Sequence, residues 1–335
     1  MTDRAPTAEA EAVIGALREA GRVILATHTH PDGDAIGSIV AMRIVLDAIG
    51  VSSRVFIAAN DLPLPEELST FDLGDLVHET TVDVSERTVV FLDCGNADRT
   101  PLGDRLADIP VLINIDHHHD NTRFGSLDWV DPAASSTAEL VWELAKWIGV
   151  PITPELAEPL YVGLLTDTGR FSYENTTPRA HAMAADLIAA GVDLTGVRRR
   201  MYEDVLPAKL HLLRYALDSF VIHGGGTLIS ARVSEADFDA AGATEAHAEG
   251  IIDILRAVRG VRIAALAREL EVQPGTFKVS LRAADPTVDV SAIARAGGGG
   301  GHPQAAGFTT ELHDADLASF VLGQLEIQDA GGARV

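Results

Sequence analysis

The 335-residue sequence is poor in cysteine and in basic residues. Its only cysteine, Cys94, excludes an intramolecular disulfide and a cysteine-based zinc cluster, so a reducing compartment fits. Lys and Arg total 26 against 49 Asp and Glu, a formal net charge of −23, which argues against long duplex DNA and anionic membranes as partners. A small phosphorylated substrate stays compatible, because bound divalent cations can invert the local sign of an acidic pocket.

The sequence also lacks a long apolar stretch. Its amino terminus, MTDRAPTAEAEAV, is acidic and shows neither a signal peptide nor a membrane span. We therefore expect a cytoplasmic protein. Hydrophobic residues make up 47% and charged residues 22% of the chain, an ordinary globular composition that argues against disorder over most of its length.

The apolar patterns that are present predict an α/β fold in two domains. A strand, an acidic loop, a helix and a second strand follow one another over 22–27, 28–37, 38–50 and 53–59, which is typical of a parallel sheet flanked by helices. Further strands are predicted at 88–95 and 110–120, and helices at 8–21, 136–149, 154–169 and 178–191.

The carboxyl-terminal part has a different pattern. Strands at 227–233, 261–270 and 277–284 with a helix at 245–258 predict a smaller domain with a mixed sheet. The expected boundaries are a first domain at 1–192, a helical linker at 193–218 and a second domain at 219–335. Residues from about 328 onward are expected to form a loose tail.

Acidic and histidine residues gather where predicted strands and helices end. THTHPDGDAIGS, residues 27–38, carries His28, Asp32 and Asp34, and further clusters lie at Asp93, at 116–118 and at Asp167. In open α/β sheets, ligands gather outside the carboxyl ends of the strands, so these clusters are expected to converge. Imidazole with carboxylate oxygens suits Mn²⁺ or Mg²⁺ better than structural zinc. Taken alone, 27–38 also fits an aspartate-rich turn in which Asp34 caps a helix.

A glycine run, GGGGGHPQAAG, follows the last predicted strand at 297–307. Either it is a flexible loop, or its glycines allow close backbone approach and its amides receive phosphate oxygens.

The motifs HTHPDGDAIGS, FLDCG, DHHHD, LLTDTG and GGGGHPQAAG resemble, in this order, those of the DHH phosphoesterase superfamily. The similarity is greatest to members with a DHHA1 carboxyl domain, the nanoRNase/pAp phosphatase group. It covers nearly the whole chain. The resemblance implies an amino-terminal DHH domain, a carboxyl-terminal DHHA1 domain and an active site in the cleft between them.

The resemblance further implies two metal ions, usually Mn²⁺, with Mg²⁺ or Co²⁺ as possible substitutes. One set of implied ligands is His28, Asp32 and Asp93, and the other is Asp34, Asp93, His117 and Asp167. Asp93 would bridge the ions. Four crowded carboxylates would repel one another unless cations lay among them. Two ions about 3.5–4 Å apart could share a hydroxide that acts as the nucleophile on phosphorus.

Other residues are assigned by the same resemblance. His118 would face the substrate and stabilise phosphoryl oxygens or protonate the leaving oxygen, and Asp116 would orient an imidazole. The implied substrate-binding residues of the second domain are Arg282, Gly299, Gly300, Gly301 and His302. His30 and His119 are assigned to the rim. Arg123 and Arg170 could contact phosphate, or could simply be solvated.

The expected function is Mn²⁺-dependent hydrolysis of short oligoribonucleotides and dinucleotides such as pApA, with pAp or cyclic dinucleotides as further substrates. A family II inorganic pyrophosphatase-like enzyme and a noncatalytic nucleotide or metal sensor are the alternatives. A larger RecJ-like exonuclease is disfavoured, because no further domain to track a long strand is evident. A homodimer through the first domain is a further hypothesis.

Overall fold

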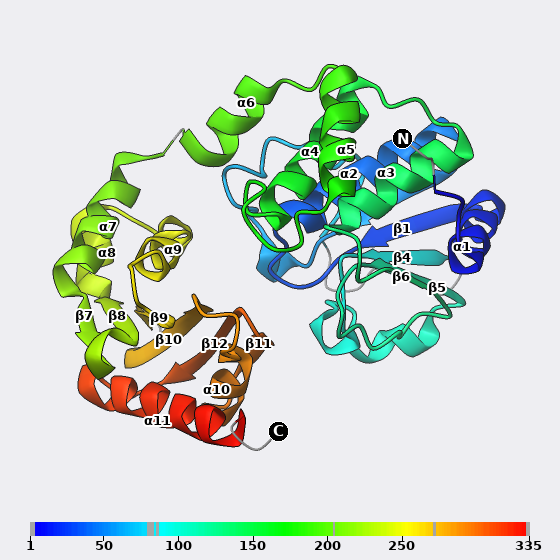
Figure 1. The fold of residues 1–335 in the computed structure, drawn as a ribbon. Helices are drawn as coiled ribbons and strands as arrows, with labels where there is room; N and C mark the ends of the chain where they lie inside the picture. The colour runs from blue at the N-terminus through cyan, green and yellow to red at the C-terminus, as the bar shows by residue number, and fades with distance from the viewer. Residues whose placement is uncertain (1–3, 79–83, 85–86, 204, 271–272, 333–335) are drawn as a thin grey trace. The chain divides into compact units, whose positions relative to one another are not determined.

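The computed structural model describes residues 4–78, 84, 87–203, 205–270 and 273–332. The chain divides into two compact units, 1–204 and 205–335, and each is described by itself (Figure 1). Together they confirm the expected two-part α/β fold, with a parallel sheet in the first unit and a mixed sheet in the second. Among the described residues, no helix is both long and apolar enough to cross a membrane.

The first unit is built on a parallel sheet with the order β3-β2-β1-β4-β5-β6. Every described strand pair in it is parallel. The strands are β1 (Arg22–Ala26), β2 (Ser52–Phe56), β3 (Leu76–Val77), β4 (Thr88–Leu92), β5 (Val111–Asp116) and β6 (Leu127–Val130). Because β1 pairs with β2 on one side and β4 on the other, the strand order reverses between β1 and β4. Such a switch point is the usual ligand site of open α/β sheets.

Helices α1 (Ala8–Glu19), α2 (Gly33–Ala48) and α3 (Thr137–Ile148) cover one face of this sheet, and α4 (Pro154–Asp167) and α5 (Pro178–Ala189) pack against these helices. Alternate strand residues such as Val23, Leu25, Val90 and Leu92 pack into their shared core. The other face buries Ile24, Phe56 and Phe91 beneath loop segments, among them the short 3₁₀ turns η2 (Ala97–Arg99) and η3 (Gly103–Asp108).

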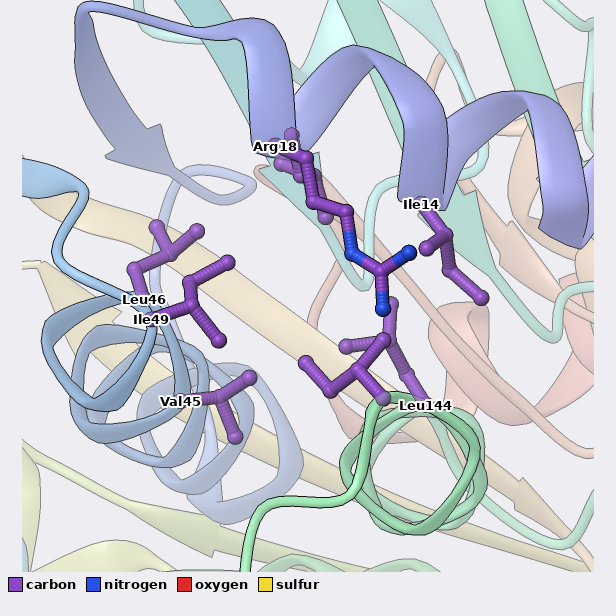
Figure 2. A pocket seen from close by; sticks show the side chains of 8 residues that line it. Ile14, Arg18, Val45, Leu46, Ile49 and Leu144 are labelled. Carbon is purple, nitrogen blue, oxygen red and sulfur yellow. The ribbon is translucent and has the colours of Figure 1, made fainter.

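Figure 2 shows a shallow recess among α1, α2 and α3. Arg18 lies over the apolar side chains of Ile14, Val45, Ile49 and Leu144 there. An arginine stem lying on apolar side chains, with its charged end reaching solvent, is a packing arrangement that needs no ligand.

Three glycines let α2 and α4 approach closely. A Cβ at Gly37 would lie 2.4 Å from the carbonyl oxygen of Pro159, and one at Gly33 would lie 2.6 Å from the Thr166 side chain. A Cβ at Gly163 would lie 2.6 Å from Asp34 Oδ1. This contact therefore brings the first turn of α2, which carries Asp34, against the last turn of α4, which carries Asp167.

The second unit contains α7 (Pro207–Ser219), α8 (Glu235–Ala241), α9 (Ile251–Arg256), α10 (Val290–Ala296) and α11 (Asp314–Gly332) around a mixed sheet of order β11-β12-β10-β9-β8-β7. Its strands are β7 (Val221–His223), β8 (Leu228–Val233), β9 (Ile263–Leu270), β10 (Gln273–Ala283), β11 (Gly300–His302) and β12 (Ala305–Thr310). Among the described strands of this second sheet, only β8 and β9 pair in parallel. Two separate cores lie on the two faces of this sheet.

Some predicted boundaries differ from the structure. The helix expected from residue 38 begins at Gly33, since Asp32 caps it by accepting from the amides of Asp34 and Ala35. The helix expected at 245–258 is a 3₁₀ turn, η6 (Glu245–Ala248), followed by α9. The loose tail expected from about 328 is wrong as far as Gly332, where α11 ends, and 333–335 lie outside the described residues. The expected linker region holds α6 (Leu194–Arg198), the π-helical turn η4 (Arg199–Glu203) and α7.

Candidate metal centre and active site

The clusters singled out in the sequence meet at the carboxyl edge of the first sheet. His28 follows β1, Asp93 follows β4 and Asp116–His118 lie at the end of β5. Asp34 and Asp167 come from the facing ends of α2 and α4. All of these strands are parallel, so their carboxyl ends share one edge, and the site lies at the switch point between β1 and β4.

A first group of possible ligands is His28, Asp32 and Asp93, which offer donor atoms within 4.8 Å of one another. His28 Nε2 lies 3.6 Å from Asp93 Oδ2. The other ring nitrogen, Nδ1, is 2.8 Å from the carbonyl oxygen of Thr29. This contact fixes the ring so that Nε2 faces the carboxylates.

A second group is Asp34, His117 and Asp167, whose donor atoms meet the same 4.8 Å limit. His117 Nε2 lies 3.5 Å from Asp167 Oδ2, 4.0 Å from Asp34 Oδ2 and 3.6 Å from Asp93 Oδ1. Asp93 therefore contacts members of both groups through different oxygens, Oδ2 toward His28 and Oδ1 toward His117.

The backbone of Asp93 is in the left-handed region, with φ 59°, and the side chain is almost fully buried. A non-glycine residue held in this region carries backbone strain that the surrounding structure must maintain. Its amide donates to the carbonyl oxygen of Ile115 at 3.1 Å, which anchors it to the neighbouring strand.

His118 belongs to a separate hydrogen-bonded chain. Its Nδ1 lies 2.7 Å from Asp116 Oδ1, and the fully buried Asp116 accepts from Asn121 Nδ2 through its other oxygen. Asn121 also donates to Asn114 Oδ1 at 2.8 Å. Nδ1 of His118 is thus committed to Asp116. His118 also forms, with Asp93 and His117, a third group whose donor atoms meet the 4.8 Å limit.

The amino end of α3 holds the two central carboxylates, a role that the sequence did not reveal. Asp34 accepts from the backbone amides of Thr137 at 2.7 Å and Ala138 at 2.9 Å. The Thr137 hydroxyl donates to Asp93 Oδ1 at 3.1 Å. Amides at a helix amino end favour an anion, so Asp34 is held by both a dipole and hydrogen bonds.

A layer of contacts behind this segment fixes it in turn. Asn175 Nδ2 lies within hydrogen-bonding distance of the carbonyl oxygen of Ser135 (2.8 Å) and of Asp167 Oδ2 (3.2 Å). The fully buried Glu139 accepts from the amide and hydroxyl of Ser135 and pairs with Arg179 of α5 at 2.5 Å. Glu139 lies in a predicted helix, but nothing in its local sequence pattern marks it as buried.

The electrostatics of the centre favour cations. Burial, together with the charges of Asp93 and Asp167, raises the pKa of Asp34 well above its usual range. Burial and the neighbouring Asp93 and Asp32 likewise raise the pKa of Asp167. Burial also opposes ionisation of Asp93, but its contact with His28 and the charges of His118 and His117 hold the pKa of Asp93 below its usual value. The charges of Asp34 and Asp167 are thus poorly compensated by the protein alone.

The predicted substrate residues of the second unit lie on adjoining strands. Arg282 of β10 pairs with Ala305 of β12, which in turn pairs with His302 of β11. Close packing requires glycine at both 299 and 301. A Cβ on Gly299 would lie 2.1 Å from the Gly307 carbonyl oxygen, and a Cβ on Gly301 would lie 2.6 Å from the Ala305 carbonyl oxygen. Gly300 has open space around it. Phosphate binding by these residues stays a prediction.

Two arginines considered as phosphate contacts have partners within the first unit. Arg123 pairs with Glu9 at 3.2 Å, and the Arg170 guanidinium lies over the Tyr202 ring. Burial raises the pKa of the Cys94 thiol to about 12, which suits a packed side chain rather than a nucleophile. His30 and His119 are both exposed, and neither belongs to a group that could hold a metal among the described residues.

Comparison with known proteins agrees with this geometry. The sequence matches the DHH family, N-terminal domain, over residues 22–164 and the DHHA1 domain over residues 225–323. It is 36% identical over 307 residues to the bifunctional oligoribonuclease and PAP phosphatase NrnA of Thermus thermophilus, an alignment that covers 89% of this chain and 87% of that one. The chain belongs to the DHH family. It is a hydrolytic phosphoesterase of that family, as the resemblance implied.

Solved structures agree with the fold of this DHH phosphoesterase. An exopolyphosphatase-related protein of Bacteroides fragilis superposes with a TM-score of 0.87 at 23% identity, over 97% of this chain and 98% of that one. RecJ of Thermus thermophilus in complex with Mn²⁺ superposes with a TM-score of 0.55 at 17% identity, over 99% of this chain but 55% of RecJ. The DHH phosphoesterase thus spans about half of that exonuclease.

Proposed function

We propose that this DHH phosphoesterase hydrolyses short oligoribonucleotides, dinucleotides such as pApA and the bisphosphate pAp, using two Mn²⁺ ions. The observation that carries the proposal is the convergence of six ligand-type side chains on one sheet edge, with Asp93 in contact with both ligand groups. The oligoribonuclease and PAP phosphatase activities named for the Thermus relative support the substrate class.

The donor set fits two divalent ions. His28, Asp32 and Asp93 would hold one ion, and Asp34, Asp93, His117 and Asp167 the other, with Mg²⁺ or Co²⁺ as possible substitutes. The raised pKa values of Asp34 and Asp167 reflect burial and like-charge repulsion that cations would relieve. When bound, such ions neutralise phosphate charge and lower the pKa of a water molecule so that it can attack phosphorus.

Residues of the chain itself hold the ligand carboxylates in place and transfer a proton. The Thr137 hydroxyl and the amides at the start of α3 keep Asp93 and Asp34 aimed at the centre. Burial opposes a charged imidazole at His118, but the hydrogen bond to Asp116 and the charge of Asp93 outweigh it and raise the pKa of His118 to about 10. Nearby cations would lower this pKa. A protonated His118 can donate to a phosphoryl oxygen or to the leaving oxygen.

We assign the selection of substrates by length to residues of the second unit. We propose that Arg282, Gly299, Gly300, Gly301 and His302 hold a nucleotide's phosphate or sugar, which would limit the enzyme to short substrates. The proposed division is a catalytic domain at 1–192, a helical linker at 193–218 and a DHHA1 domain at 219–335. The net charge of −23 supports the exclusion of long duplex DNA. A cytoplasmic homodimer remains our proposal from the sequence.

The test is a substrate panel with metal-stripped enzyme. Matched di- to pentaribonucleotides, pAp, a cyclic dinucleotide and inorganic pyrophosphate are each assayed with and without Mn²⁺. The proposal expects Mn²⁺-stimulated release of mononucleotides from the shortest RNAs and phosphate release from pAp. Turnover of pyrophosphate alone would favour the pyrophosphatase alternative, and tight nucleotide binding without turnover would favour a sensor.

A further inference from the structure

Arg99 stands out among the arginines of the first unit. It ends η2, the 3₁₀ turn after the Asp93 loop, and its carbonyl oxygen accepts from the Thr29 amide at 2.9 Å. That bond ties the turn to the loop that carries His28. Asn96 caps the same turn by accepting from the amide of Asp98. The backbone of Arg99 is therefore anchored between two segments that supply metal-ligand candidates.

Among the residues that the structure describes, the side chain of Arg99 has no partner of its own. Its guanidinium makes no hydrogen bond, ion pair or ring contact with the residues that the structure describes, although the side chain is half-buried. By contrast, Arg4, Arg54, Arg123 and Arg179 each pair with a carboxylate. In a chain with 49 acidic and 26 basic residues, a half-buried arginine without a carboxylate partner is unexpected.

The turn that carries Arg99 adjoins the catalytic centre. It follows the Asp93 loop, and its bond to the Thr29 amide joins it to the residue directly after His28, whose Nε2 lies 3.6 Å from Asp93 Oδ2. A fixed positive charge at this place weakens the binding of divalent cations, so by itself it is unfavourable for a metal site. An anion that binds after the metal ions would offset the repulsion between them and the guanidinium.

We propose that the Arg99 guanidinium binds the scissile phosphate of the substrate. A planar guanidinium can donate two parallel hydrogen bonds to phosphoryl oxygens, which lysine cannot reproduce. The reacting phosphorus must lie beside the metal ligands, and Arg99 lies on a turn that is joined to the loops of two of them, His28 and Asp93. The inference deepens the proposed function and rests on it for the identity of the substrate.

The test compares Arg99→Gln with Arg22→Gln. Both substitutions remove one positive charge from the first unit, but Arg22 is exposed at the amino end of β1, opposite the edge that follows Ala26. Mn²⁺ affinity and the affinity of the Mn²⁺-loaded protein for inorganic phosphate are measured by calorimetry. Turnover is measured with bis(p-nitrophenyl) phosphate, with ApA and with pApA.

We expect opposite effects on the two ligands. Arg99→Gln should weaken phosphate binding and lower kcat/KM by about 10- to 100-fold for all three substrates, since a hydrogen bond to a charged group is lost. Mn²⁺ binding should stay the same or tighten. Arg99→Lys should recover part of the loss, and Arg22→Gln should match the wild type.

Three results would overturn the inference. The first is phosphate binding by Arg99→Gln that equals that of Arg22→Gln. The second is a joint loss of Mn²⁺ and phosphate binding, which would mark a structural role. The third is a loss of turnover with pApA but not with ApA, which would place Arg99 on the terminal phosphate. If the wild type cleaves neither RNA nor pAp while Arg99→Gln still loses inorganic phosphate, the proposed substrate fails and the role of Arg99 stands.

Discussion

Arg179→Met is expected to destabilise the first unit through the carboxylates that it leaves behind. Arg179 pairs with Glu139 at 2.5 Å, Glu143 at 3.3 Å and Asp131 at 3.6 Å. Glu139 is fully buried, and the Glu143 side chain is only 8% exposed. Methionine fills a similar volume without charge, so the substitution leaves these carboxylates facing one another with Arg4 as the remaining cation near Asp131 and Glu143.

The magnitude follows from burial. Removing one partner of a buried ion pair costs about 3–5 kcal/mol, and the Arg179 side chain is 32% exposed, so we take about 3 kcal/mol. For a unit of about 200 residues this lowers the melting temperature by roughly 6–12 °C. Burial raises the pKa of Glu143 already in the wild type. Its protonation at low pH stabilises the folded state, so the defect should shrink as the pH falls from 8 to 5.

Tryptophan fluorescence during urea unfolding measures this defect in the first unit alone, because Trp129, Trp142 and Trp147 all lie there. The double variant Glu139→Gln with Arg179→Met removes the buried charge together with its partner and should be less destabilised than the sum of the two single variants. A loss under about 1 kcal/mol in Arg179→Met, or strict additivity in the cycle, would refute this explanation.

Three further predictions concern the metal centre. Thr137→Val removes the hydroxyl that donates to Asp93 and should weaken Mn²⁺ binding by about 10- to 100-fold in calorimetry. An unchanged Mn²⁺ affinity would show that this hydrogen bond does not help to hold Asp93. Gly163→Ala places a methyl group 2.6 Å from Asp34 Oδ1, so it should lower the free energy of unfolding by about 1–3 kcal/mol and weaken Mn²⁺ binding. The control Gly15→Ala places a methyl group with nothing within 4 Å and should be neutral or stabilising in the same urea titration. Mn²⁺ should raise the melting temperature more at pH 8 than at pH 5.5. Burial and neighbouring carboxylates raise the pKa values of Asp34 and Asp167, so the metal-free protein loses stability as these groups lose their protons. An equal rise in melting temperature at both pH values would contradict this prediction.

The sequence predicted the placement of the ligand candidates because that placement follows from topology. Apolar runs before His28, Asp93 and Asp116 identified parallel strands, and parallel strands share a carboxyl edge. Asp167 was recognised as the end of a helix, but its position beside Asp34 depends on the close α2–α4 contact. That contact follows from glycines whose packing role only the folded chain reveals.

Residues that act through tertiary contacts could not be found in the same way. Thr137 was predicted near a helix cap, yet its bond to Asp93 joins residues 44 positions apart. Asn175 and Arg99 lie in loop or turn segments without a periodic pattern, so nothing local marked them. Arg99 could have been suspected from its place six residues after Asp93 in a chain short of basic residues. The short strands β3, β6, β7 and β11 were missed because two to four residues carry too little pattern.

The most direct test of the two-metal proposal is anomalous diffraction from crystals grown with Mn²⁺. We predict two peaks, each within coordination distance of one Asp93 oxygen, the first beside His28 and Asp32 and the second beside Asp34, His117 and Asp167. A single peak, or an Asp93 side chain that coordinates neither ion, would contradict the shared-carboxylate centre.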